Sequence, residues 1–214
     1  MKNLTKILFL SLLLISTSVY TYAQESQFGV KGGLNLSNMT IDGNDDSNLK
    51  AGLHVGVFNK IMISDAFAIQ PELLYSSKGF QHVFNNEVIT DGEVNYNLNY
   101  IDLPVKLVFY LADDFSFQLG PYVGYLVNAN VEVDNAELLN DFFEVDSQDD
   151  IDRDNFNAID FGLTGGLGFE FEPLVVGFNY NLGLSQVAKE NEPAELMLSD
   201  AKNTVIQVYA GITF

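Results

Sequence analysis

Hydrophobic and polar residues alternate with a period of two along most of the chain from residue 28 onward. Successive side chains of a β-strand point to opposite faces, so this period predicts strands rather than amphipathic helices. The eight alternating segments span residues 28–36, 52–57, 67–76, 101–109, 115–125, 159–169, 174–184 and 205–214. The alternation changes phase once, between Tyr100 and Ile101. A β-bulge near Tyr100 would restore a continuous apolar face, and we expect one there.

The connections between these segments alternate between short and long. Short turns are expected at 64–65, 113–114 and 172–173, and longer polar segments at 37–49, 81–92, 129–155 and 186–202. Short turns at one end and long loops at the other are typical of outer-membrane barrels. The pattern therefore predicts an all-β fold, an eight-stranded antiparallel transmembrane β-barrel with up-and-down meander topology. Its short turns would be periplasmic and its long acidic loops extracellular.

The composition of the two strand faces favours a membrane barrel over a soluble one. A soluble barrel would carry Lys and Glu on its outer face, but the less apolar face here is rich in glycine. Glycine suits the crowded interior of a narrow, strongly coiled sheet. The apolar face carries aromatic residues near the strand ends, as in the two aromatic girdles of membrane barrels.

The first 23 residues have the features of an export signal. Lys2 and Lys6 precede an apolar run at 7–15, and 21–23 reads Thr-Tyr-Ala. This order is typical of a secretory signal peptide, so we expect residues 1–23 to be cleaved. Residues 24–214 would then form one outer-membrane β-barrel domain, without a helical membrane span, because no later apolar run approaches 18 residues.

Charge and residue usage exclude several classes of protein. The 214 residues include 29 acidic and 10 basic side chains, a net charge of -19, which argues against a nucleic-acid partner. Mean hydropathy is nevertheless +0.10, too apolar for a disordered acidic chain. Cysteine is absent and histidine occurs twice. Thiol chemistry, cysteine metal sites and a lipoprotein anchor are therefore not expected, and no cofactor is predicted.

Four stretches carry a family resemblance: FGVKGGLNLS at 28–37, IQPELLYSSKGF at 69–80, YIDLPVKLVFY at 100–110 and VYAGITF at 208–214. With them, residues 24–214 resemble the outer-membrane β-barrel "porin family" proteins of the PorT-like group, common in Bacteroidota. The resemblance implies a place in the bacterial cell outer membrane, in contact with its lipid. Phe214 resembles the C-terminal signal read by the barrel-insertion machinery, and the barrel is expected to be a monomer.

Two groups of charged residues are candidates for function. The alternation places three basic and three acidic residues on the inner face, which an eight-stranded barrel fills with side chains. Because buried charges persist only when paired, we expect a neutralising plug rather than an ion path. Asp102 and Lys106 lie two alternation steps apart on the same face of one segment. We therefore predict that Asp102→Ala leaves Lys106 unpaired and destabilises the barrel. The six residues are Lys31, Glu72, Lys78, Asp102, Lys106 and Asp160.

The second group is the acidic segment expected to face outside. Carboxylates are preferred ligands of Ca²⁺, so divalent cations could bind at the loops, although a solvated, self-repelling loop accounts for the same pattern. An EF-hand is rejected, because Ser47 and Leu53 occupy the positions that need Gly and Glu. The acidic residues are Asp141, Glu144, Asp146, Asp149, Asp150, Asp152 and Asp154.

The sequence is compatible with three functions. The first is a structural or surface-interaction role for the extracellular loops. The second is a narrow channel for water or small cations, favoured by acidic vestibules. The third is an assembly or secretion factor, which the resemblance implies for some members. An enzyme is not expected: there is no G-x-S-x-G elbow, and His54 suits interior hydrogen bonding better than catalysis.

Overall fold

Nine strands and one short 3₁₀ helix make up the computed structural model, which describes residues 26–40, 49–86, 89–134, 148–150, 153–189 and 200–214. The predicted signal peptide lies outside these residues. The elements are β1 (Ser26–Thr40), β2 (Lys50–Ser64), β3 (Phe67–Asn86), β4 (Ile89–Ala112), β5 (Phe115–Asp134), β6 (Gln148–Asp150), η2 (Arg153–Asn155), β7 (Ile159–Phe171), β8 (Leu174–Gln186) and β9 (Lys202–Thr213). In the part of the chain that the structure describes, no helix has the length and hydropathy needed to cross a membrane.

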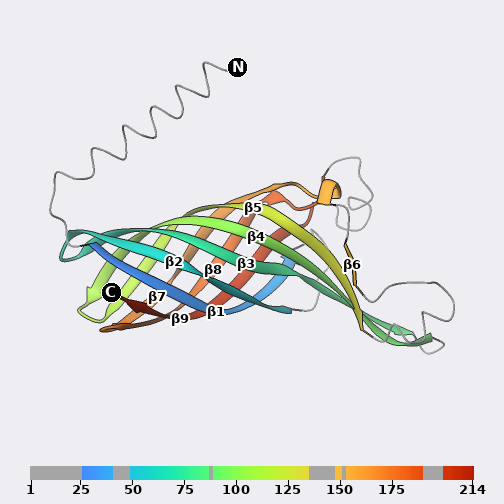
Figure 1. The fold of residues 1–214 in the computed structure, drawn as a ribbon, viewed down its shortest axis with the longest axis horizontal. Helices are drawn as coiled ribbons and strands as arrows, with labels where there is room; N and C mark the ends of the chain where they lie inside the picture. The colour runs from blue at the N-terminus through green and yellow to red at the C-terminus, as the bar shows by residue number, and fades with distance from the viewer. Residues whose placement is uncertain (1–25, 41–48, 87–88, 135–147, 151–152, 190–199) are drawn as a thin grey trace, which may run out of the picture.

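Eight of the strands close into a barrel (Figure 1). Each pairs with its neighbours in an antiparallel ladder, and the first strand, β1, closes the ring by pairing with the last, β9, from Gly29↔Thr213 to Thr40↔Lys202. Strand β6 stands outside the ring, and within the described residues its partners are residues 130–132 of β5. The predicted eight-stranded up-and-down meander is therefore confirmed.

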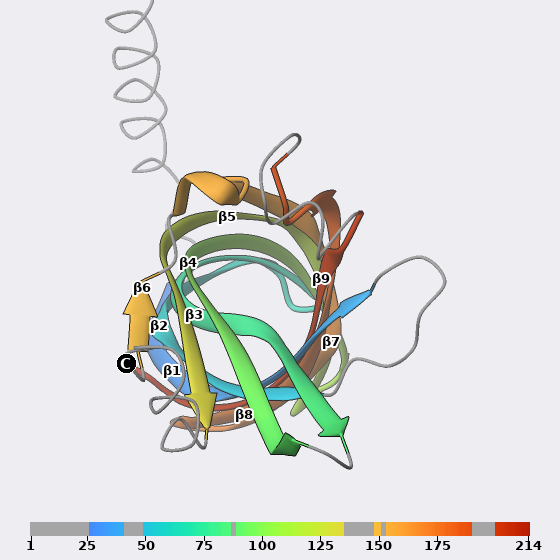
Figure 2. The same ribbon diagram turned by 90° about the vertical axis from the view of Figure 1, so that its right-hand side faces the viewer.

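The two ends of the barrel differ. At one end two-residue turns at 65–66, 113–114 and 172–173 join the strands, and we call this the turn end. At the opposite end, the loop end, β3, β4 and β5 continue past their neighbours as a projecting ribbon (Figure 2). The predicted loop at 81–92 is thus wrong, since pairing between β3 and β4 continues to Asn86↔Ile89. Backbone pairing above the barrel needs no apolar face, so polar side chains do not end it.

The sheet irregularity expected near Tyr100 has a different form from the one predicted. Tyr100 pairs with Leu126 and Asn99 with Asn128, so the extra residue, Val127, belongs to β5. Strand β4 does not change phase, and Leu98 and Tyr100 stay on its inner face, fully buried. The expectation of a continuous apolar outer face on β4 was therefore wrong. The inner face itself becomes apolar towards the loop end.

That apolar inner segment belongs to a hydrophobic cluster that fills the lumen at the loop end. Phe156, in the segment after η2, joins the cluster and pairs with Ala188 in an isolated bridge. The ring of Phe80 stacks on that of Tyr96 with centroids 4.4 Å apart. The buried members are Met39, Phe80, Leu98, Tyr100, Leu126, Ala129, Phe156, Val187, Ala188 and Ala201.

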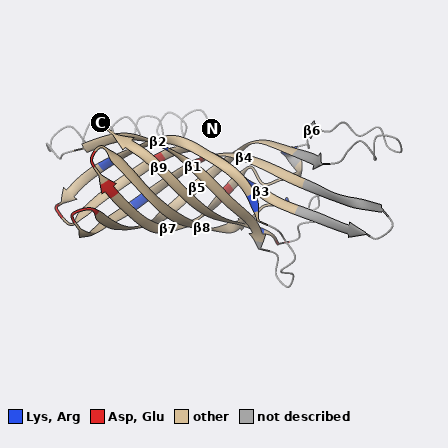
Figure 3. Cartoon of the chain, turned by 90° about the horizontal axis from the view of Figure 1, so that it is seen from below, with Lys and Arg blue, Asp and Glu red and all other residues tan. Residues whose placement is uncertain are grey.

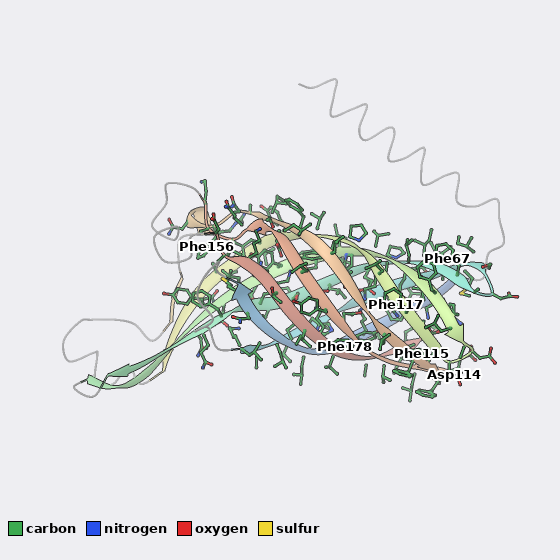
Figure 4. The ribbon with its side chains drawn as sticks, turned by 180° about the vertical axis from the view of Figure 1, so that it is seen from behind. Phe67, Asp114, Phe115, Phe117, Phe156 and Phe178 are labelled. Carbon is green, nitrogen blue, oxygen red and sulfur yellow. The ribbon has the colours of Figure 1, made fainter. Side chains whose placement is uncertain are left out.

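The outer wall carries a wide apolar surface. Its large hydrophobic side chains are exposed, for example Leu53 at 65%, Leu103 at 53% and Leu163 at 47%. A water-soluble protein rarely exposes a continuous apolar area of this kind. Aromatic residues gather towards the turn end, where Phe67, Phe115, Phe117 and Phe178 can be followed in Figure 4. The wall therefore fits a lipid environment.

Several inner-face glycines leave space for aromatic rings on neighbouring strands. A Cβ at Gly177 would overlap the Tyr209 hydroxyl group, one at Gly29 would overlap Phe58, and one at Gly162 would lie 2.8 Å from the Tyr122 ring. The narrow lumen can hold these rings only where the opposing residue has no side chain. This explains the glycine-rich face more directly than coiling alone.

We predict that Gly177→Ala destabilises the barrel by about 1–3 kcal/mol, since its methyl group would meet both Tyr209 and the backbone carbonyl of Leu167. Gly165→Ala is the matched control, because a Cβ there meets nothing closer than Leu119 Cδ1 at 3.5 Å. Urea unfolding in detergent, followed by circular dichroism, measures both. Equal stability of the two variants would contradict the ring-over-glycine account.

Candidate functional site

The inner face of the barrel holds a network of buried charges. All six charged residues expected on this face lie there, none more than 3% exposed. In Figure 3 the blue and red segments of the strands mark the charged residues along the barrel. The network divides into groups at different heights between the turn end and the loop end.

The first group surrounds Glu72 on β3. Its Oε2 lies 2.6 Å from Lys31 Nζ of β1, and its Oε1 lies 3.1 Å from Lys106 Nζ of β4. Gln70 donates a third hydrogen bond to Oε1 at 2.7 Å. The Tyr209 ring lies beside both ammonium groups, 4.5 Å from Lys31 Nζ. One carboxylate therefore serves two lysines.

The second group surrounds Lys78 on β3, nearer the loop end. Its Nζ lies 3.0 Å from Asp102 Oδ1 and 3.1 Å from Asp160 Oδ2. The rings of Tyr100 and Tyr122 lie 4.7 and 4.8 Å from the same nitrogen. Here one ammonium group pairs with two carboxylates. The first group has the opposite ratio, two ammonium groups to one carboxylate.

The expected partnership of Asp102 and Lys106 was wrong. Asp102 pairs with Lys78, while Lys106 pairs with Glu72. Both residues are on the inner face of β4, four positions apart, with Leu74 and Gln70 of β3 as their ladder partners. Each side chain instead reaches a charged β3 residue further along that strand, Lys78 for Asp102 and Glu72 for Lys106.

A third ion pair, missed by sequence reasoning, lies at the turn end. Lys60 of β2 pairs with Glu170 of β7, and the Tyr110 hydroxyl group lies 3.2 Å from Glu170 Oε1. The signal was present in the sequence. Extending the alternation towards the turn end, by two steps from Gly56 and by one step from Gly168, places Lys60 and Glu170 on the inner face.

Between the Glu72 and Lys78 groups lies a layer of neutral polar side chains. Asn35 Nδ2 donates to Ser76 Oγ at 3.0 Å, and Asn35 Oδ1 accepts from Gln207 Nε2 at 3.1 Å. His54 Nδ1 lies 2.8 Å from the same oxygen. His54 is thus an interior hydrogen-bonding residue, as expected. The layer connects four consecutive strands of the ring, β3, β2, β1 and β9, on the lumen side.

The acidic segment is only partly described. Asp149 and Asp150 are in β6, and Asp154 is in η2. Asp141, Glu144, Asp146 and Asp152 lie outside the described residues, so loop cation binding stays a prediction. Within the described ranges, no group of three or more His, Cys, Asp or Glu residues could hold a metal ion.

Phe214 is exposed at the turn end, and its N–H donates to the Phe28 carbonyl at 2.8 Å.

Comparison with known proteins supports the architecture. Residues 22–189 match the family model described as outer membrane protein beta-barrel domain. Comparison with curated proteins finds no significant match. Neisserial surface protein A is 13% identical, with 89% of this chain and all of that chain covered and a TM-score of 0.51. Ail of Yersinia pestis is 18% identical, with 89% and 99% covered and a TM-score of 0.44.

We predict that Glu72→Gln destabilises the barrel far more than Asp102→Asn. The first change leaves two buried lysines without a carboxylate and should cost about 3–5 kcal/mol. After the second change, Lys78 keeps Asp160 as a partner, so the loss should be much smaller. Urea unfolding of both variants in detergent measures the difference. A loss of stability that is larger for Asp102→Asn would contradict the assignment of partners.

Proposed function

The chain belongs to the outer membrane protein beta-barrel domain family, and from this premise we propose that it is a closed barrel of the bacterial outer membrane with a structural or surface-interaction role. The barrel would anchor the chain in the lipid, and the loop end would face the outside. The work of the protein would then depend on what the loop end presents, and not on passage through the lumen.

The filled lumen is the observation that carries this proposal. From the turn end to the loop end, the lumen holds the Lys60–Glu170 pair, the Glu72 group, the layer of hydrogen-bonded amides, the Lys78 group and finally the apolar cluster. An ion on its way through would have to break buried pairs and then cross an apolar region, both at high cost. These barriers argue against the narrow-channel alternative.

The projecting ribbon is the best candidate for an interaction element. Strands β3, β4 and β5 rise beyond the ring, and β6 adds to the β5 edge there. The segment at 129–155, which begins in the last residues of β5, is the most acidic in the sequence, with ten carboxylates against the single Arg153. We expect the ribbon to hold this segment above the membrane, where a cationic partner or divalent ions could reach it.

A secretion or assembly role of the PorT-like kind would be tested by secretion in a deletion strain. A non-enzymatic role fits an inner face whose carboxylates are engaged with lysines. The proposed reading of Phe214 by the insertion machinery fits an aromatic residue next to the seam between β1 and β9.

We expect purified barrels in planar lipid bilayers to show no steady conductance on the nanosiemens scale. The physical reason is the succession of paired charges and the apolar cluster across the lumen. A known porin inserted in the same bilayer gives the positive control. Stable, uniform conductance steps from the purified chain would overturn the filled-barrel proposal in favour of the channel.

Orientation can be tested separately, because the chain has no cysteine. Asn86→Cys places a single thiol at the tip of the β3–β4 hairpin, and Asp114→Cys places one at the turn end (Figure 4). We predict that a membrane-impermeant maleimide labels the first variant in intact cells and the second only after lysis. Labelling of the Asp114→Cys variant alone in intact cells would show that the orientation is reversed.

A further inference from the structure

A small recess lies in the lumen near the turn end, between the Lys60–Glu170 pair and the group around Glu72. Its volume is about 10 Å³, which is close to the roughly 10–15 Å³ that one water-sized occupant needs. The polar residues that line it are Lys31, Lys60, Gln70, Gln118, Glu170 and Tyr209. Lys31, Lys60, Gln70 and Gln118 are each at most 3% exposed, so the recess is a built polar site.

The buried charges around this recess do not balance. Among the described residues, this half of the lumen holds three ammonium groups, from Lys31, Lys60 and Lys106, but two carboxylates, from Glu72 and Glu170. The opposite excess, one ammonium group against two carboxylates, belongs to the Lys78 group nearer the loop end. The Asn35 layer separates the two halves. An uncompensated charge in a buried site is costly.

The carboxylates present cannot supply the missing negative charge at the recess. Both oxygens of Glu72 are engaged, with two ammonium groups and the Gln70 amide. Glu170 is engaged with Lys60 and Tyr110. Each lysine ammonium group carries three donors, and Lys31 and Lys60 both line the recess. The recess is therefore lined by two ammonium groups but one carboxylate.

We propose that this recess binds one small monovalent anion of halide size. A chloride or bromide ion is larger than a water molecule, so the long lysine side chains that line the recess would have to give way to admit it. The ion would then meet ammonium and amide donors on several sides. The polar layer and the apolar cluster close the lumen beyond it, so the ion would enter and leave at the turn end. The acidic residues of the turn end, Asp65, Asp113, Asp114 and Glu172, are all exposed, where water and salt screen their repulsion.

Bromide diffraction tests the proposal directly. Crystals of the full barrel in detergent, grown in sodium bromide and measured at the bromine absorption edge, should show an anomalous peak between Lys31, Lys60 and Gln118. A spherical density without anomalous signal would identify water there and overturn the proposal. This measurement uses the unaltered protein and does not depend on any variant folding.

Thermal unfolding in solution distinguishes a specific anion site from bromide that binds only at the high concentration used in the crystal. The thermal unfolding midpoint in detergent is measured while sodium chloride or bromide replaces sodium gluconate at constant ionic strength. We expect the midpoint to rise by several degrees and then saturate. Lys60→Gln, which removes one donor from the recess, should lose most of this rise, whereas Lys202→Gln, at an exposed position of β9, should keep it.

The outcomes are distinct from those of the conductance test. A bromide peak together with a saturable rise that Lys60→Gln abolishes would support the anion site. A peak without any halide effect on the midpoint would indicate an adventitious ion only, and would overturn it. A rise that Lys202→Gln removes as fully as Lys60→Gln would also overturn it, because the effect would then come from surface charge.

Discussion

The pairing of charges inside a narrow lumen is the constraint on which the rest of this structure depends. Eight strands enclose a space that side chains fill, with little room for water to solvate an ammonium or carboxylate group. Charged residues can remain there only if other strands supply their partners. Lys31, Glu72 and Lys106 come from three strands, as do Lys78, Asp102 and Asp160. The Lys78–Asp160 and Lys60–Glu170 pairs join strands that are not neighbours in the ring, and so tie it together across its width.

The other features of the barrel follow from the same lack of space. Tyrosine rings lie against the lysines, and glycines on adjacent strands make room for those rings. Towards the loop end the polar filling gives way to Leu98, Tyr100 and Leu126, with Phe156 from outside the ring. The barrel is thus a solid support in the membrane, and the parts free to vary lie at the loop end.

Much of the fold could be predicted from the sequence because lipid outside and polar filling inside impose a period of two. The strand number, the meander order and the inner position of six charged residues follow from that period. The partners of those residues did not, because pairing depends on the stagger between strands. Asp102 and Lys106 are close in sequence yet meet different β3 residues. The ribbon was missed for another reason: above the barrel the strands no longer need an apolar face.

The apparent phase change at Tyr100 comes from the filling of the lumen and not from a turn of the strand. Apolar residues on the inner face of β4 mimic a change of face in the sequence, because the alternation alone cannot distinguish an apolar interior from an apolar outer wall. In the structure the interior changes character and the strand does not. Periodicity assigns residues to faces, but only the packing of the whole ring shows what each height of the lumen contains.

The central claim is that buried pairing across the lumen, and not the ladder alone, holds this barrel together. A double-mutant cycle between Lys78→Met on β3 and Asp160→Asn on β7, whose buried side chains pair across the lumen, tests it most directly when it is read by urea unfolding in detergent. The account predicts a coupling energy at the upper end of the range of about 0.5–3 kcal/mol measured for residues in contact. Additive effects of the two substitutions, with no coupling energy, would contradict it.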